Sequence, residues 1–192
     1  MQRHYDGVRD LAARFEQQTR SVTLGDASLA GGERVSGRVV FAKPGRMRWS
    51  YEAPEPSLLV SDGAVLWLYD PTAREAQRLP VKQGYLTGAA LEFLLGEGKL
   101  LEEFAVSAES CEAQGEVALD LRPRRPASYE RLGLRVSADS GEILATHVVD
   151  LFGNVTRIAF SEIRTNQDPP LELFTFEVPE GVEVIDLIVP DG

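Results

Sequence analysis

Hydrophobic and polar residues alternate with a period of two along much of this chain. The octapeptide RMRWSYEA, residues 46–53, shows the pattern plainly. Every second residue from position 47 to position 51 is large and apolar, namely Met47, Trp49 and Tyr51, and the residues between them are charged or small. Successive side chains of a strand point to opposite faces of a sheet. The octapeptide therefore predicts a strand with one apolar face and one face, carrying Arg46 and Arg48, that meets water.

Short strands at hairpin spacing account for most of the chain. The two-residue period extends from residue 21 to about residue 81, with turn formers at Pro44-Gly45, Asp62-Gly63 and Asp70-Pro71. Further strands are predicted over residues 104–107, 117–122, 132–137, 143–150, 156–162 and 173–178. Many short strands joined in this way are typical of an antiparallel sheet.

Two segments have apolar residues at helical spacing instead. Tyr5, Val8 and Phe15 belong to the first, which predicts an amphipathic helix over about residues 3–18. The second predicts helical structure over about residues 85–103. The sequence thus predicts a mainly β (α+β) fold, a strongly curved antiparallel sheet with helices on a single face, in one domain spanning residues 1–192.

Composition narrows the possible partners. The 192 residues carry a formal net charge of −10, which argues against nucleic acid because phosphate contacts require clustered basic side chains. No apolar run approaches the roughly 20 residues of a membrane-spanning helix. With no coiled-coil pattern, we expect a monomer.

Residues that could carry catalytic chemistry are scarce. His4 and His147 have no Cys or carboxylate at metal-ligand spacing, and the single cysteine, Cys111, stands between glutamates that discourage a thiolate. The GEGK tetrapeptide at residues 96–99 imitates a phosphate loop, but Leu100 occupies the position of its Ser or Thr. We expect neither an enzyme nor a bound metal or cofactor.

The segment VVFAKPGRMRWSYEAPEPSLLVSDGAVLWLYDP, residues 39–71, resembles the signature of the LolA family, the periplasmic carriers of outer-membrane lipoproteins. Residues 153–166 and 174–186 also resemble that family. The resemblance implies an incomplete antiparallel β-barrel with an α-helical lid, built from about residues 3–18 and 85–103, over an apolar cavity for acyl chains. The function it implies is a carrier that moves lipoproteins from the inner to the outer membrane.

Partners and location follow from the same resemblance. The cargo would be acylated lipoproteins, received from an inner-membrane LolCDE-type ABC release complex and passed to a LolB-type outer-membrane acceptor. A periplasmic location is implied, so we expect an export leader to have been removed, with Met1 in its place.

The resemblance also suggests site residues. Lys43 stands where the family typically has an arginine that ties the lid shut, and it is either a weakened latch or a lysine extending to the rim. Lysine is a point charge with three donors, whereas arginine offers a planar fork of five. The residues expected to line the acyl-chain cavity are Phe41, Met47, Trp49, Tyr51, Leu59, Trp67, Leu91, Leu94 and Leu95.

Three alternatives stay open on the same fold. One is a carrier of another lipid that serves a different exporter. Another is a regulatory module that senses a lipoprotein without transporting it. The third is the acceptor lipoprotein itself, which needs a cysteine at its mature N-terminus, whereas Cys111 is internal.

Overall fold

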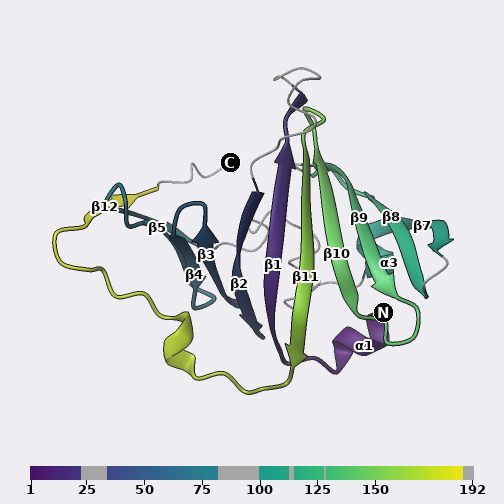
Figure 1. Cartoon of the computed structure of the whole chain (residues 1–192), viewed down its shortest axis with the longest axis horizontal. Coiled ribbons are helices and arrows are strands. Elements are labelled where there is room, and N and C mark those ends of the chain that lie inside the picture. Colours follow the sequence, from purple (N-terminus) through teal and green to yellow (C-terminus); the bar gives the residue numbers. More distant parts are fainter. Residues whose placement is uncertain (23–33, 82–99, 113–114, 128, 188–192) are drawn as a thin grey trace.

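The computed structural model describes residues 1–22, 34–81, 100–112, 115–127 and 129–187 (Figure 1). In chain order its elements are α1 (Gln2–Asp6), β1 (Asp10–Arg20), β2 (Arg34–Ala42), β3 (Arg46–Ala53), β4 (Ser57–Ser61), β5 (Val65–Asp70), β6 (Glu75–Pro80), α3 (Leu100–Glu103), β7 (Phe104–Glu112), β8 (Glu116–Pro123), β9 (Tyr129–Ser137), β10 (Ile143–Asp150), β11 (Val155–Thr165), the 3-10 helix η3 (Leu171–Phe174) and β12 (Glu183–Asp186).

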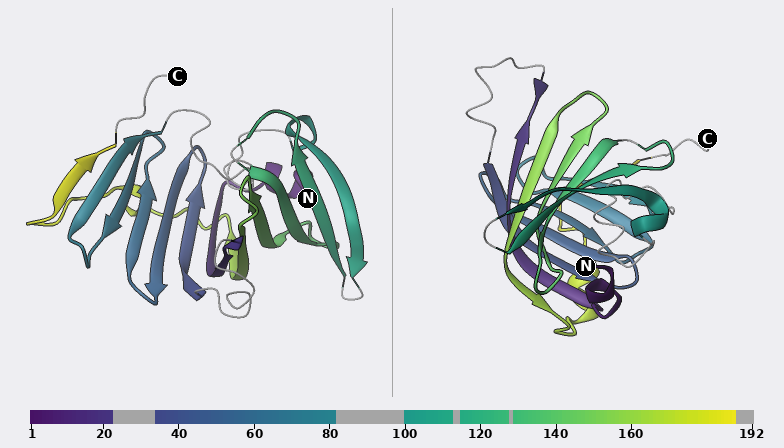
Figure 2. Two further views of the ribbon diagram at one scale, coloured as in Figure 1. Left: turned by 90° about the horizontal axis from the view of Figure 1, so that it is seen from above. Right: turned by 90° about the vertical axis from the view of Figure 1, so that its right-hand side faces the viewer.

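One twelve-stranded sheet contains all of these strands, in the order β12-β6-β5-β4-β3-β2-β1-β11-β10-β9-β8-β7. Figure 2 shows that the sheet is curved and does not close, since β12 and β7 lie at its two ends. The central strands β1 and β11 separate two arms, one of β2–β6 with β12 and the other of β7–β10. The predicted mainly β, curved and open architecture is confirmed, but an entirely antiparallel sheet is wrong, because β12 pairs with β6 in parallel.

The helix predicted over residues 3–18 is wrong for most of its length. Only Gln2–Asp6 is helical, and Asp10–Arg20 forms β1, which pairs with β2 on one side and β11 on the other. Leu11 and Phe15 are four residues apart, a spacing that puts two side chains on one face of a helix and equally on one face of a strand. Ladder bonds on both sides of the segment decide in favour of the strand.

The inner face of the sheet carries the main hydrophobic cluster. In β1 the side chains of Leu11, Ala13 and Phe15 are buried in it, while Arg14 and Glu16 point to the outer face and are exposed. The two described α-helices contribute to the same cluster: Tyr5 of α1 and Leu100 of α3 are both buried there.

Of the helix predicted over residues 85–103, the structure describes only Leu100–Glu103, which are helical, and the other residues lie outside the described part. Among the described residues, no helix has the length and apolar character needed to cross a bilayer.

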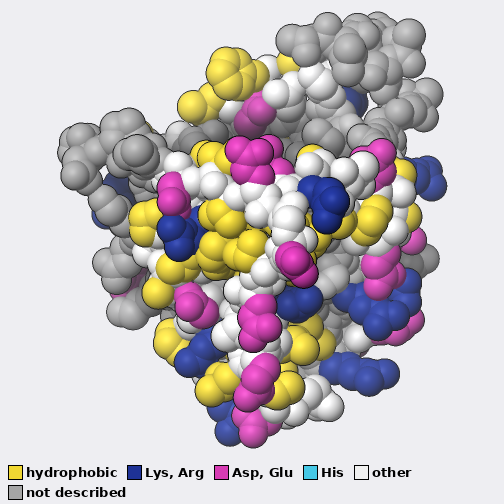
Figure 3. Space-filling view, turned by 90° about the vertical axis from the view of Figure 1, so that its left-hand side faces the viewer, with side chains coloured by type: hydrophobic (Ala, Val, Ile, Leu, Met, Phe, Trp, Pro, Cys, Tyr) yellow, Lys and Arg dark blue, Asp and Glu magenta, His cyan; other side chains and the backbone are white. Residues whose placement is uncertain are grey.

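The segment between β11 and β12, residues 166–182, runs across the outer face of the first arm and is called the strap below. The Arg48 guanidinium donates to the Leu173 carbonyl oxygen at 3.1 Å, so this arginine meets the strap as well as water. Phe174 of the strap is buried, as are the outer-face residues Val60 and Ala76. Figure 3 shows hydrophobic side chains gathered in the middle of this side of the molecule.

The strand predicted over residues 173–178 is wrong. Its first two residues complete η3, and residues 175–178 belong to no strand of the sheet. Prolines at positions 169, 170 and 179 flank the segment and, having no backbone N–H, cannot extend a ladder at either end of it.

Candidate functional site

A continuous apolar wall covers the inner face of the first arm. The register pairs Phe41 with Met47, and Trp49 with Leu59, so these four side chains share one face. Phe41, Met47 and Trp49 are buried, whereas Leu59 and Tyr51 are half-buried against the same cluster. Five of the side chains predicted to line a cavity are therefore brought together by the sheet.

Phe15 is the centre of this wall and was missed by the sequence reasoning. Its ring lies 4.8 Å from that of Trp49 and 5.2 Å from that of Tyr51, both edge-to-face. Gly37, which pairs with both Phe15 and Tyr51, makes room for these rings across β2. The alternation in β1 carried the signal, but the helical interpretation of that segment concealed it.

Trp67 does not belong to the wall. It pairs with Val60, which pairs with Arg48, and this row is on the outer face, opposite to Trp49. There its ring lies 5.2 Å from that of Phe176 in the strap, with the Arg78 guanidinium 5.4 Å away over its face. The prediction that Trp67 lines the inner cavity is therefore wrong. Leu91, Leu94 and Leu95 lie outside the described residues.

The second arm extends the apolar surface with residues that the prediction did not include. Two inner-face rows cross it, each defined by register: Leu119, Leu134, Thr146 and Ile158, then Val106, Leu121, Leu132 and Val148. Seven of these eight side chains are aliphatic. The two-residue period of these strands is visible in the sequence. Which of the two alternating sets of side chains faces inward depends on the neighbouring strands, so the sequence did not decide it.

Lys43 connects the sheet to α1. Its ammonium Nζ donates to the Tyr5 carbonyl oxygen at 2.8 Å, and its backbone N–H donates to the Arg9 carbonyl oxygen, also at 2.8 Å. Burial lowers the pKa of the Lys43 ammonium, and the nearby Asp6 carboxylate opposes that effect. The Tyr5 carbonyl oxygen, at the end of the helix, also accepts from the Val8 N–H at 3.2 Å, so the lysine is its second donor.

Two further contacts hold α1 in place. The backbone N–H of Ile143, in the second arm, donates to the Tyr5 hydroxyl oxygen at 2.9 Å, and burial raises the pKa of that phenol to about 12. Asn166, after β11, donates through Nδ2 to the Gly7 carbonyl oxygen at 3.2 Å and accepts from the Arg9 N–H at 2.8 Å. Helix α1 is therefore joined to both arms of the sheet.

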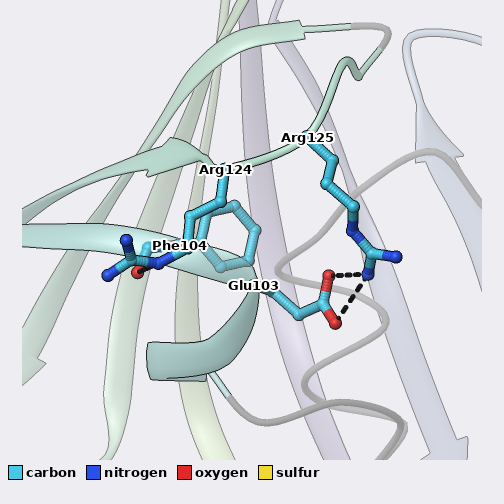
Figure 4. A network of polar contacts seen from close by, with 4 residues as sticks. All are labelled: Glu103, Phe104, Arg124 and Arg125. Atoms are coloured by element: carbon cyan, nitrogen blue, oxygen red, sulfur yellow. Dashed lines mark hydrogen bonds and ion pairs between the residues drawn. The ribbon is translucent and has the colours of Figure 1, made fainter.

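Helix α3 is tied to the turn between β8 and β9 (Figure 4). The Arg125 guanidinium contacts both carboxylate oxygens of Glu103, at 2.7 and 2.9 Å. Arg124 donates to two backbone carbonyl oxygens at the junction of α3 and β7. Its backbone N–H donates to that of Glu103 at 2.9 Å, and its side-chain Nε donates to that of Phe104 at 3.1 Å. The described ends of the helical regions are thus both fixed by polar contacts to the sheet.

Comparison with known proteins decides the family. The family model of the outer membrane lipoprotein carrier protein LolA matches residues 6–177. This chain belongs to the LolA family. The outer-membrane lipoprotein carrier protein of Dechloromonas aromatica is 32% identical over 155 residues, covering 80% of this chain and 72% of that protein. That of Azotobacter vinelandii is 33% identical over 183 residues, covering 94% and 83%.

A solved structure has a similar fold. The crystal structure of an uncharacterized conserved protein from Thermus thermophilus superimposes with a TM-score of 0.60 at 12% identity, covering 97% of this chain and 95% of that one. At this identity the likeness concerns the fold alone. The resemblance to the LolA family drawn from residues 39–71 is confirmed by the family match.

Proposed function

We propose that this LolA-family chain is a carrier, not an enzyme, that binds the acyl chains of lipoproteins against the inner face of its sheet. The observation that supports this most directly is the apolar wall. It continues from Trp49 in the first arm, through Phe15 in the central strand β1, to Leu134 in the second arm. Its relatives are named outer-membrane lipoprotein carrier proteins. Residues 1–192 would act as a single carrier domain.

The energetics suit such a carrier. Each methylene moved from water to an apolar surface contributes about 0.8 kcal/mol, so long acyl chains would be held strongly against water. Membranes solvate the chains about as well as a protein does. Release therefore needs a closed empty state that lowers the affinity for cargo by a few kcal/mol. The tie between Lys43 and α1 would stabilise that closed state as a latch.

The remaining parts of the proposal come from the family. The carrier would work in the periplasm as a monomer, loaded by an inner-membrane LolCDE-type ABC release complex and unloaded to a LolB-type acceptor. Leu91, Leu94 and Leu95 would line the acyl-chain cavity together with Phe41, Met47, Trp49, Tyr51 and Leu59. Neither a metal nor a cofactor takes part.

Adjacent leucines of β4 give a matched test. Leu59 faces inward and Leu58 outward, since Leu58 pairs with Ser50 and Tyr69, and both leucines are half-buried. We expect wild-type protein and Leu58→Glu to co-purify with acyl lipid from membrane-containing cells, and Leu59→Glu to lose it, as measured by native mass spectrometry. Circular dichroism checks that both variants fold.

Two results would count against the carrier. One is wild-type protein that carries no acyl lipid. The other is an equal loss of lipid in Leu58→Glu and Leu59→Glu, because binding that ignores the direction of the side chain does not use the inner wall.

A further inference from the structure

The turn between β10 and β11 presents large apolar side chains to solvent. Leu151 and Phe152 are 64% and 81% exposed, although they are among the largest hydrophobic residues of the chain. Val22, just after β1, is 50% exposed and lies against the same turn, because its N–H donates to Asn154 Oδ1 at 3.1 Å. Figure 1 shows this turn beside the end of β1 at the top of the molecule. We call these three side chains the apolar tip.

Hydrogen bonds within the turn hold the tip in one conformation. The Asp150 carboxylate accepts from the N–H groups of Phe152 and Asn154, both at 2.8 Å, and from the Asn154 side-chain amide at 2.7 Å. The Gly153 N–H donates to the Asp150 carbonyl oxygen at 3.1 Å. Three successive N–H groups of the turn are thus satisfied internally. Such a turn can enter a poorly hydrated layer without the cost of unpaired backbone donors.

Arginines surround the tip along the same edge of the sheet. Arg20 pairs with Val155, directly after the turn, and the β8–β9 turn lies next along the edge because Asp150 pairs with Tyr129. The end of β8 contributes the exposed Arg122, and the turn itself contributes the exposed Arg124 and Arg125.

The arginines offset the carboxylates of this edge. Arg122 contacts Asp120 at 3.3 Å and Arg125 contacts Glu103 at 2.7 Å, while Glu102 and Glu130 are also exposed nearby. With the Asp150 carboxylate of the tip's own turn counted, four arginines stand against five carboxylates, so this edge is close to balance on a chain whose net charge is −10. An approach by this edge avoids most of the repulsion that the acidic chain would meet at a phosphate-rich surface.

We propose that the apolar tip, with its flanking arginines, docks this protein on the surface of a lipid bilayer. A projecting Phe and Leu can enter the interfacial layer while arginine stems lie along it with their charges among the head groups. A specific protein partner is less suited, because a stable interface buries about 800 Å² on each side and three side chains on a turn offer far less. The use of such docking rests on the proposed carrier function, since cargo is collected and delivered at membranes.

A vesicle-binding assay with matched variants tests the docking. Purified protein is floated with phosphatidylcholine vesicles as wild type, as Leu151→Ser/Phe152→Ser, and as the control Leu171→Ser/Val178→Ser. The control removes two apolar side chains from the strap that are 59% and 40% exposed. We expect the partition coefficient to fall about tenfold in the tip variant and to stay within about twofold of wild type in the control. Both variants keep Asp150 and Asn154, and equal urea midpoints check their folding.

Three outcomes would overturn the proposal: no vesicle binding by wild type, undiminished binding by the tip variant, or equal losses in both variants. The first would show that the tip does not dock on a bilayer. Leu59→Glu separates this proposal from the carrier function, because it should bind vesicles like wild type while carrying no acyl lipid. Wild-type protein that binds vesicles but carries no acyl lipid would refute only the carrier function, and wild-type protein that carries acyl lipid but binds no vesicles would refute only the docking.

Discussion

Replacing Lys43 by methionine isolates the contact between the sheet and α1. Methionine keeps much of the apolar stem but removes the charge and the donors, so the 2.8 Å bond to the Tyr5 carbonyl oxygen is lost. The backbone bond from Lys43 to the Arg9 carbonyl oxygen and the contacts of Tyr5 and Asn166 remain. The variant should therefore loosen α1 without detaching it.

The size of the effect follows from the environment of the ammonium group. A hydrogen bond from a charged donor contributes about 1.5–3 kcal/mol when it is well shielded. Lys43 is only half-buried, and the burial that lowers its pKa also disfavours its charge, so we discount the contribution to about 1 kcal/mol. A change of about 1.4 kcal/mol alters an equilibrium constant tenfold, so a loss of about 1 kcal/mol should raise the equilibrium constant for opening of α1 about fivefold.

Hydrogen exchange measures this opening directly. The N–H groups of Tyr5, Gly7 and Val8 are bonded within the first eight residues and should exchange about fivefold faster in Lys43→Met. Lys43→Arg, which keeps a donor, should exchange like wild type, as should Arg38→Met, which removes an exposed charge from the outer face. Unchanged exchange in Lys43→Met, or the same acceleration in all three variants, would refute the latch.

Two further predictions concern residues that hold the site together. Burial raises the pKa of Tyr5 to about 12 from 10.0, so the stability that its neutral phenol contributes is complete below pH 10 and is lost as the pH rises to 12. Urea unfolding should show a loss of about 3 kcal/mol over that range that is absent from Tyr5→Phe, and parallel pH profiles would contradict it. A methyl group on Gly37 would overlap the Ser50 carbonyl oxygen and approach Phe15, so Gly37→Ala should cost about 3 kcal/mol. In Gly7→Ala the new methyl group makes an ordinary contact, and an equal cost in both variants would disprove the crowding argument.

Local features of the fold were predictable because short-range contacts produce them. The Asp62-Gly63 turn is one example: Asp62 Oδ1 accepts from the N–H groups of Ala64 and Val65, both at 2.8 Å, and Gly63 takes a φ of +98° that suits glycine. Such turns need no information from distant segments. The parity of Met47, Trp49 and Tyr51 was predictable for the same reason, since a strand fixes it locally.

Features that depend on distant segments were not predictable. Whether Leu11 and Phe15 belong to a helix or a strand was decided by β2 and β11, and both spacings fit the sequence equally. The direction of Trp67 was decided by the strap, which supplies Phe176 as an apolar partner on the outer face. An aromatic residue in an alternating strand marks an apolar surface, but which surface depends on what covers it.

The position of α1 relates the shape of the sheet to the contact between Lys43 and Tyr5. Lys43 reaches α1 from the end of β2, and Ile143 reaches it from the start of β10, so the short helix spans the two central strands between the arms. Both bonds end on the same residue, one on the carbonyl oxygen of Tyr5 and the other on its hydroxyl. Any separation of β2 from β10 must lengthen at least one of these bonds, because α1 has only five residues over which to distribute the strain. Tyr5 is deeply buried while Lys43 is half-exposed, so the lysine bond is the one that water can replace at the lower cost. Widening of the inner face should therefore break the Lys43 contact first and leave Tyr5 seated on the second arm.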